Sequence, residues 1–342
     1  MHLLEFSDSG LYCPVGDFYI DPWRPVKCAL ITHGHSDHAR WGSAHYITHK
    51  DTIPIIKYRI SPDISVQGYG YNERFSINGV KISLHPAGHI IGSAQIRVEY
   101  KGEVWVASGD YKVEDDGFST PFEPVPCNTF ITECTFGLPV FNWQPQKEIF
   151  EDMNQFWSGN IENEKATIII GYSLGKAQRI LQNIDTGIGE IYAHGAIQNM
   201  HKVLSTYNGD LRPTIAVTQD VPKSAYRKAL ILAPPSALGT PWMKKFEPYS
   251  VGIASGWMGL RGARRRRAVD RGFILSDHAD WQGLNTAIRA SGAERVYATH
   301  GYTAIFAKWL NEIGLEAYEG KTHFEIGKED GPVNENIETE AP

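Results

Sequence analysis

One seven-residue segment, Thr-His-Gly-His-Ser-Asp-His, concentrates side chains that bind metal ions. It contains His33, His35, Asp37 and His38, and it follows a short apolar run that we expect to be a buried strand. Imidazole nitrogens and carboxylate oxygens are the ligands that zinc and similar divalent ions prefer in proteins. Because one residue separates His33 from His35, both side chains can point the same way on an extended loop and hold one ion. Asp37 and His38 are then placed for a second ion.

Further ionisable residues follow predicted strands elsewhere in the chain. They are His89, Asp110, Glu133, His278 and His300. The strand expected before Asp110 runs from residue 103 to residue 110. Functional side chains of α/β proteins gather at the carboxyl ends of strands. We therefore expect these residues to meet the histidine-rich segment at one edge of a sheet.

The elements that must position these residues change in character along the chain. Residues 1 to about 140 alternate like short strands with Gly, Pro and Asn turns. From about residue 145, helical and strand-like patterns alternate, which indicates a parallel sheet. The pattern of strands that end in candidate ligands returns near the C-terminus. We expect a first domain in two parts, 1–142 and 256–326, with an α/β insertion at 143–255 and an acidic, disordered tail at 327–342.

Taken together, these motifs resemble the metallo-β-lactamase superfamily and its β-CASP branch of nucleic-acid-processing enzymes. The superfamily resemblance rests on His-x-His-x-Asp-His, Phe18–Asp21, His89 and Asp110. The β-CASP resemblance rests on Glu133 in Glu-Cys-Thr-Phe-Gly, His278 in Ser-Asp-His-Ala-Asp, His300 in Thr-His-Gly, and the segment 171–178. The segments 10–17 and 20–25 also resemble the bacterial ligase-associated DNA exonuclease family.

The resemblance implies an α/β fold in which a metallo-β-lactamase αββα sandwich is interrupted by a smaller β-CASP-type insertion. It implies two divalent metal ions, zinc first and manganese as the alternative. The implied site is one ion on His33, His35 and His89, a second on Asp37, His38 and His300, and Asp110 bridging both. His278 would donate a proton or clamp a phosphate, Glu133 would orient His278, and Asp21 would support a ligating histidine. Asp37 and Asp110 would thus serve catalysis as well as metal binding.

Charge is distributed unevenly, although the net charge of the chain is −6. Residues 261–271 contain six arginines and one aspartate, and the segment beyond Lys328 contains five carboxylate side chains and no base. Arginine suits phosphates because its planar guanidinium donates in pairs. We expect Arg264, Arg265, Arg266 and Arg267 to contact substrate phosphates. Ser173 and Lys176, at a predicted strand-to-helix turn, are weaker candidates for the same role.

Apolar runs, the N-terminus and the cysteines indicate in which cell compartment the protein is expected. No apolar run approaches the length of a membrane span, and the N-terminus lacks the pattern of a signal peptide. The four cysteines have no spacing typical of a disulfide framework or a zinc ribbon. We expect a cytoplasmic protein with free thiols.

The function that the resemblance implies is a metal-dependent exodeoxyribonuclease, acting at 5′ ends in DNA repair. Its partner would be DNA that is single-stranded or has free ends, with functional association with a DNA ligase and a helicase. An RNA-processing β-CASP ribonuclease is the first alternative, since the histidine at position 278 is typical of that branch too. A small-molecule metallo-hydrolase is the second, and Glu133, His278 and the insertion argue against it.

Overall fold

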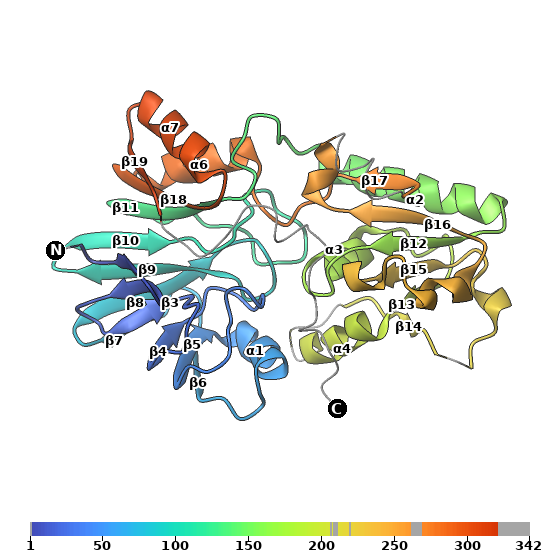
Figure 1. The fold of residues 1–342 in the computed structure, drawn as a ribbon, viewed down its shortest axis with the longest axis horizontal. Helices are drawn as coiled ribbons and strands as arrows, with labels where there is room; N and C mark the ends of the chain where they lie inside the picture. The colour runs from blue at the N-terminus through green and yellow to red at the C-terminus, as the bar shows by residue number, and fades with distance from the viewer. Residues whose placement is uncertain (1, 206, 208–210, 219, 261–268, 321–342) are drawn as a thin grey trace. The chain divides into compact units, whose positions relative to one another are not determined.

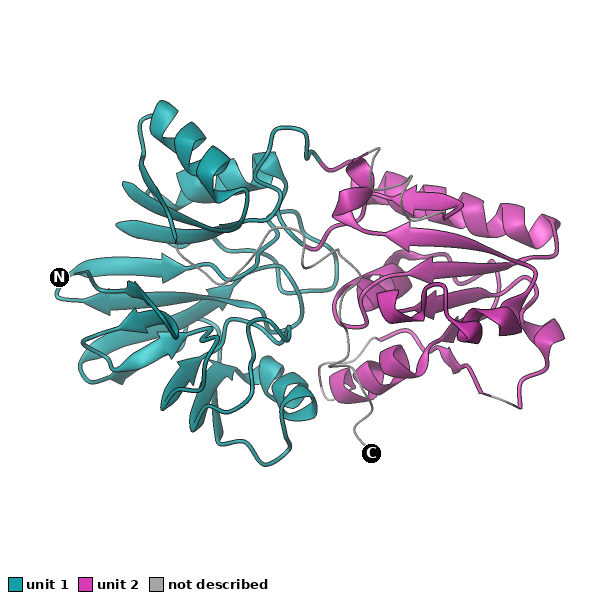
Figure 2. Ribbon diagram, in the orientation of Figure 1, with its two compact units in different colours: residues 1–142, 278–328 teal, residues 143–277, 329–342 magenta. Residues whose placement is uncertain are grey.

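The computed structural model describes residues 2–205, 207, 211–218, 220–260 and 269–320. The chain forms two compact units (Figure 2). Unit 1 comprises the described residues of 1–142 and 278–328, and unit 2 those of 143–277. The described residues of 256–277, expected in the returning part of the first domain, therefore cluster with the insertion. Among the described residues, the chain passes from unit 1 to unit 2 at 142–143 and returns to unit 1 at 277–278.

The first sheet of unit 1 has the strand order β1-β2-β3-β4-β5-β6. Its strands are β1 (Glu5–Ser7), β2 (Gly10–Cys13), β3 (Phe18–Ile20), β4 (Cys28–Leu30), β5 (His45–His49) and β6 (Val66–Tyr69). The first three pair antiparallel, and from β3 onward each neighbour is parallel. The short helices η1 (Lys50–Thr52) and α1 (Ile53–Arg59) connect β5 to β6.

The second sheet of unit 1 has the order β19-β18-β11-β10-β9-β8-β7. Its strands are β7 (Arg74–Ile77), β8 (Val80–Pro86), β9 (Ala94–Tyr100), β10 (Glu103–Ala107), β11 (Thr129–Cys134), β18 (Arg295–Gly301) and β19 (Glu316–Glu319). The strands β7 to β10 form antiparallel hairpins, and β10, β11, β18 and β19 run parallel. β10 ends three residues before Asp110, so Asp110 lies on the following loop rather than on the strand.

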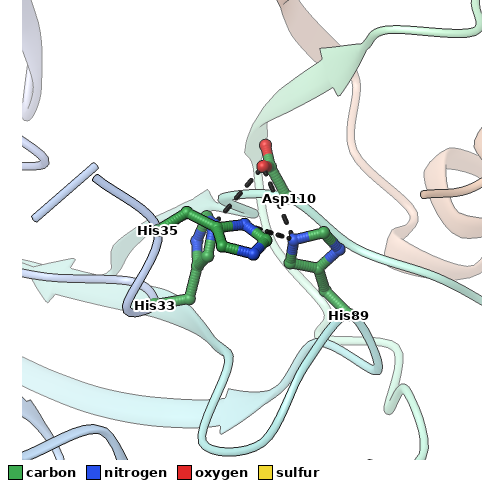
Figure 3. Close-up of side chains that lie close together, drawn as sticks. All are labelled: His33, His35, His89 and Asp110. Carbon is green, nitrogen blue, oxygen red and sulfur yellow. Dashed lines mark hydrogen bonds and ion pairs between the residues drawn. The ribbon is translucent and has the colours of Figure 1, made fainter. Parts of the chain in front are cut away.

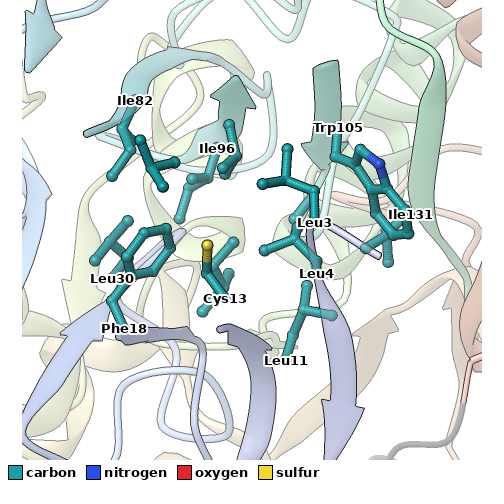
Figure 4. Close-up of a cluster of buried hydrophobic side chains, with 14 of the residues drawn as sticks. Leu3, Leu4, Leu11, Cys13, Phe18, Leu30, Ile82, Ile96, Trp105 and Ile131 are labelled. Carbon is teal, nitrogen blue, oxygen red and sulfur yellow. The ribbon is translucent and has the colours of Figure 1, made fainter. Parts of the chain in front are cut away.

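A core of apolar side chains fills the space between the two sheets of unit 1 (Figure 4). Leu11, Phe18 and Leu30 enter it from the first sheet, and Ile96 and Trp105 from the second. Alternation along each strand turns these side chains to the shared core.

Helices cover the outer faces of both sheets (Figure 1). α6 (Trp281–Ser291) and α7 (Thr303–Glu312) pack on the second sheet through residues such as Leu284 and Phe306. Ile56 of α1 packs on the first sheet against Ala29 and Tyr46. These four layers are the expected αββα sandwich.

Unit 2 is built on one parallel sheet with the order β14-β13-β15-β12-β16-β17. Its strands are β12 (Ala166–Ile170), β13 (Ile191–Ala193), β14 (Ile215–Ala216), β15 (Leu230–Ala233), β16 (Tyr249–Ala254) and β17 (Arg271–Phe273). The helices α2 (Gln146–Glu162), α3 (Lys176–Asn183) and α4 (Gly195–Leu204) contribute to one apolar cluster with the sheet. A second cluster involves η2 (Lys223–Tyr226), η4 (Pro241–Phe246) and η5 (Gly256–Gly259), and η3 (Pro235–Ala237) follows β15. The predicted alternation of strands and helices is thus confirmed.

None of the described helices is long and apolar enough to cross a membrane. The four cysteines are free thiols, with Cys13 and Cys134 buried and Cys28 and Cys127 half-buried.

Candidate metal centre

The residues that the sequence selects as ligands come from separate loops and strand ends of unit 1. His33, His35, Asp37 and His38 follow β4, and Ala94 N–H donates to the carbonyl of Thr32 at 2.8 Å, which ties this loop to the second sheet. His89 follows β8, and Asp110 follows β10. Glu133 and His300 are the penultimate residues of β11 and β18, and His278 precedes α6. The ends of neighbouring strands therefore bring distant parts of the chain to one place.

The first cluster consists of His33, His35, His89 and Asp110 (Figure 3). Nδ1 of His35 lies 3.1 Å from Nε2 of His33 and 3.1 Å from Nε2 of His89. Oδ2 of Asp110 lies 3.4 Å from Nε2 of His33 and 3.7 Å from Nε2 of His89. In a tetrahedron with zinc–ligand bonds of 2.0–2.1 Å, ligand atoms are about 3.3 Å apart. The donor set and its spacing thus fit one zinc-sized ion.

The second cluster shares Asp110 and adds His38 and His300. Nε2 of His38 lies 3.4 Å from Oδ2 of Asp110, and the rings of His38 and His300 are 5.3 Å apart between centroids. Asp37 lies beside this cluster, with Oδ2 3.5 Å from Nε2 of His38. The structure thus brings the predicted residues of the second ion together around the shared carboxylate, with Asp37 at the rim.

His300 reaches the cluster through an irregularity of its strand. β11 and β18 pair Glu133 with Thr299 and Cys134 with Gly301, so His300 is an extra residue in the ladder. Its φ angle is +48°, in the left-handed region that a histidine rarely adopts. A β-bulge re-aims a side chain at a strand end, and such strained conformations concentrate at functional sites. The fold therefore holds His300 in this conformation next to Asp110.

Asp21 supports the histidine-rich loop from behind. One carboxylate oxygen accepts from the backbone N–H of Thr32 at 2.8 Å, and the other accepts from the Thr32 hydroxyl at 2.5 Å. The latter oxygen also lies 2.7 Å from Nδ1 of His38. This bond orients the imidazole so that Nε2 faces Asp110, which is the arrangement by which carboxylates support metal-binding histidines.

A third cluster consists of Asp110, Glu133 and His278. Nδ1 of His278 lies 3.0 Å and 2.9 Å from the two oxygens of Glu133. Glu133 is buried and also accepts from the backbone N–H of Tyr111 at 2.8 Å and from the hydroxyl of Thr135 at 2.6 Å. The His278 ring packs beside His89, with 4.7 Å between centroids. The carboxylate thus fixes both the place and the orientation of the imidazole.

Burial and charge perturb the acid–base properties of this cluster. Burial by itself raises the pKa of Asp110, but the nearby His38 and His278 outweigh it and hold that pKa well below its ordinary value. Burial by itself lowers the pKa of His38, but Asp110, Asp37 and Asp21 hold it well above its ordinary value. Burial lowers the pKa of His35 and of His300, and neighbouring histidines lower both further. Asp110 is therefore an ionised carboxylate beside the neutral imidazoles of His35 and His300, whereas His38 must give up a proton to bind a cation.

Two of the residues predicted to contact substrate are buried in unit 2. Nζ of Lys176 lies 2.7 Å from Oδ2 of Asp277, and both side chains are buried. Ser173 is buried two residues before the helix α3 cap at Gly175. Contact of Ser173 or Lys176 with a substrate stays a prediction, as does contact by Arg264, Arg265, Arg266 and Arg267, which lie outside the described residues.

Sequence reasoning missed several residues that hold this machinery. The hydroxyl of Thr135 donates a hydrogen bond to the Glu133 carboxylate. The sequence offered one indication of this role, the position of Thr135 two residues after Glu133. Asp277 accepts from Lys176 and, at 3.2 Å, from Nη1 of Arg179, which also donates to the carbonyl of Ser276 at 2.5 Å. Adjacency to His278 was the available signal for Asp277, whereas nothing in the local pattern distinguished Arg179.

No family model matches the chain. Among curated proteins, it is 28% identical over 319 residues to a protein named "Probable DNA ligase" from Opitutus terrae, covering 92% of this chain and 31% of that protein. It is 25% identical to "RNase J-like protein" from Methanocaldococcus jannaschii, covering 61% of this chain and 56% of the relative. It is 25% identical to "Endoribonuclease YSH1" from Saccharomyces cerevisiae, covering 46% of this chain and 22% of the relative. The chain thus spans about a third of the length of the first relative, about half of the second and about a fifth of the third.

A crystal structure of a protein of unknown function from Enterococcus faecalis V583 shares the fold, with a TM-score of 0.56 and 11% identity. The match covers 79% of this chain and 74% of that chain. The relatives and the architecture confirm the predicted resemblance to the β-CASP branch of the metallo-β-lactamase superfamily. They also confirm the predicted fold class, an αββα sandwich interrupted by an α/β insertion.

Proposed function

We propose that this chain hydrolyses phosphodiester bonds of nucleic acid with two divalent metal ions, zinc or manganese. The observation that carries the proposal is the sharing of Asp110 by three adjoining clusters of potential ligands. His33, His35 and His89 would hold one ion, and His38 and His300, with Asp37 beside them, would hold the other. When bound, two ions in such a site supply a nucleophilic water at neutral pH and neutralise charge on phosphate oxygens.

The protein's own groups supply the proton for the leaving oxygen. Glu133 engages Nδ1 of His278, so Nε2 on the other side of the ring is the atom that delivers a proton to the leaving group or binds a phosphate oxygen. Thr135 and the backbone N–H of Tyr111 hold Glu133 in place. Asp21 orients His38 in the same way that Glu133 orients His278, through a hydrogen bond to Nδ1.

DNA is the substrate that we propose, with exonuclease action at 5′ ends during repair. The resemblance of segments 10–17 and 20–25 to the ligase-associated exonucleases supports DNA. The relative from Opitutus terrae, named as a probable DNA ligase and matched over 92% of this chain, supports it too. Functional association with a DNA ligase and a helicase is part of the same proposal.

One assay tests the proposal and its polarity. Single-stranded and double-stranded DNA and RNA, labelled at either end, are incubated with the metal-loaded protein and resolved on a sequencing gel. A 5′ exonuclease releases mononucleotides or short products from a 5′ label at once and shortens a 3′-labelled strand gradually. The Asp110→Ala variant is the matched negative control. Cleavage of neither nucleic acid, together with hydrolysis of a β-lactam or a thioester, would refute the proposal in favour of a small-molecule hydrolase.

RNA is the second candidate substrate, and a specific observation favours it. The archaeal relative is named as RNase J-like and the fungal relative as an endoribonuclease. Preferential cleavage of RNA in the same assay, with internal rather than terminal products, would assign the chain to this alternative.

A further inference from the structure

Trp41 is exposed in a way that sets it apart from every other tryptophan of the chain. All nine tryptophans lie within the described residues, and eight are buried or half-buried. Trp41 has 74% of its surface exposed. Tryptophan carries the largest aromatic surface of any side chain, so leaving it in water forgoes a large gain from burial. A scattered apolar residue on a surface is ordinary, but its surroundings here are not.

The backbone around Trp41 is held firmly. The hydroxyl of the buried Tyr46 donates to the carbonyl of Arg40 at 2.8 Å and accepts from the N–H of Ser43 at 3.0 Å. One phenol of strand β5 therefore fastens the chain on both sides of Trp41. On the upstream side, Ala39 N–H donates to the carbonyl of His35 at 2.8 Å. The indole is thus presented by an ordered turn and not by a loose loop.

The same turn packs against the segment 24–26. Gly42 has φ +104°, and a Cβ added there would lie 2.8 Å from Cγ of Pro25, so only glycine allows this approach. Ala44 N–H donates to the carbonyl of Val26 at 2.9 Å, which fixes the two segments together. Arg24, next to Pro25, is thereby brought to the same turn as Trp41.

Two exposed guanidinium groups accompany Trp41. Arg40 precedes it, and Nε of Arg40 donates to the carbonyl of Asp37 at 3.2 Å, which places Arg40 against the metal-binding loop. Within the described part of the chain, neither Arg24 nor Arg40 forms an ion pair with a carboxylate. Trp41 follows His38 by three residues, and a chain of that length spans at most about 11 Å. The backbone of Trp41 therefore lies within about 11 Å of His38 in the second cluster, and the segment that carries Arg24 adjoins the same turn.

We propose that Trp41 is a stacking platform for one unpaired base of the substrate strand, with Arg24 and Arg40 binding the flanking phosphates. An exposed aromatic ring on an ordered turn, bordered by unpaired cations, is how proteins bind single strands without reading their sequence. The ring supplies affinity for the base face, and the guanidiniums supply affinity for the backbone. This inference rests on the proposed function and adds to it a subsite for a single strand, whether DNA or RNA.

The experiment compares Trp41→Ala and Trp41→Phe with the wild-type protein. Binding of a labelled oligothymidylate is measured by fluorescence anisotropy with a chelator present, so that no strand is cut. A strand of equal length with abasic residues at every internal position retains the phosphates but lacks the bases. Hydrolysis of bis-p-nitrophenyl phosphate by the metal-loaded proteins reports on the metal centre. Tyr318→Ala, which removes another exposed aromatic ring of unit 1, is the matched control.

Stacking predicts that Trp41→Ala binds oligothymidylate roughly five- to a hundredfold more weakly, while Trp41→Phe retains most of the affinity. The wild-type preference for the normal strand over the abasic strand should shrink by the same factor in Trp41→Ala. Turnover of the small diester should be unchanged, and Tyr318→Ala should behave as wild type. Equal binding of oligothymidylate by Trp41→Ala and the wild type would overturn the inference alone. If the wild type neither binds nor cuts nucleic acid, the proposed function fails and the subsite falls with it.

Discussion

Replacing Glu133 by Gln isolates the part that this carboxylate plays through His278. The substitution keeps the size of the side chain but removes its charge and turns one acceptor oxygen into an NH₂ donor. In the structure, both oxygens of Glu133 accept: one from Tyr111 N–H at 2.8 Å, the other from Thr135 at 2.6 Å, and both lie within 3.0 Å of Nδ1 of His278. In one orientation the new NH₂ group faces the N–H of Tyr111, and in the other it faces Nδ1–H of His278, so a donor meets a donor in both.

The magnitude follows from what each residue does. Loss of an outer carboxylate that orients a functional histidine costs about 10–100-fold in activity. Loss of a general acid or base costs about a hundred- to ten-thousand-fold, and we expect that range for His278→Ala. If Glu133 acts only through His278, the double variant should be no slower than His278→Ala. The coupling energy between the two sites would then be about 1.4–2.8 kcal/mol, the full effect of the Glu133→Gln change.

The assay is the rate of nuclease cleavage under saturating substrate for the wild type, both single variants and the double variant. Metal content by elemental analysis and urea unfolding accompany each protein, because Glu133 is buried and its loss could act through folding. All four proteins should hold two metals per chain, because neither residue is proposed as a ligand of an ion. Independent effects that multiply in the double variant would refute the role of Glu133 through His278, and loss of one metal equivalent in His278→Ala would make that histidine a ligand.

Four further changes test other parts of the molecule. Asp110→Ala should lower the metal content markedly below two ions per chain and abolish hydrolysis, because three clusters share this carboxylate; full metal content measured by elemental analysis would contradict that sharing. Replacing the arginines at 264–267 by Gln should weaken nucleic-acid binding and reduce the slope of log affinity against log salt by nearly one per lost phosphate contact, with small-diester hydrolysis unchanged; an unaltered slope would show that the run is only solvated. Lys176→Met breaks a buried ion pair and should destabilise the protein by about 3 kcal/mol in urea unfolding, whereas a change below 1 kcal/mol would mean that Arg179 alone satisfies the carboxylate. Burial lowers the pKa of His49 from 6.5 to about 4. As the pH falls between these values, the unfolded chain takes up a proton at this histidine before the folded chain does, so up to about 3 kcal/mol of stability should be lost. The His49→Phe variant should lose less stability over the same pH range, measured by urea unfolding midpoints.

The sequence indicates that His33, His35, His89 and Asp110 lie close together, because these residues are near one another along the chain or stand at recognisable strand ends. His33 and His35 share one loop, and His89 and Asp110 each follow a strand whose pattern is visible. The division of the ligands between two ions, and the roles of Glu133 and His278, were expected only through the family resemblance. Glu133 and His278 are 145 positions apart, and no spacing rule joins them.

Other features depend on tertiary register and packing, which local pattern does not contain. The bulge that turns His300 toward Asp110 arises from the pairing of β11 with β18. Lys176 stands at the helix start that the pattern predicts, but its partner Asp277 is 101 positions away, so its burial could not be foreseen. The exposure of Trp41 is equally invisible in sequence, where a tryptophan is first assigned to a core.

The late return of β18 to the second sheet has a consequence for biosynthesis. β11 is made long before its parallel neighbour, since Thr129 pairs with Arg295. At about 5–20 residues per second, the ribosome needs roughly 8–33 s to reach β18 after making β11. During that interval unit 2 can fold around its own sheet, while β11 presents an unpaired apolar edge, the kind of surface on which chains aggregate. His278 and His300 arrive on the same late segment, so a nascent chain cannot complete the second and third clusters. Any hydrolysis that depends on these two clusters therefore has to wait until residues 278–300 have been made.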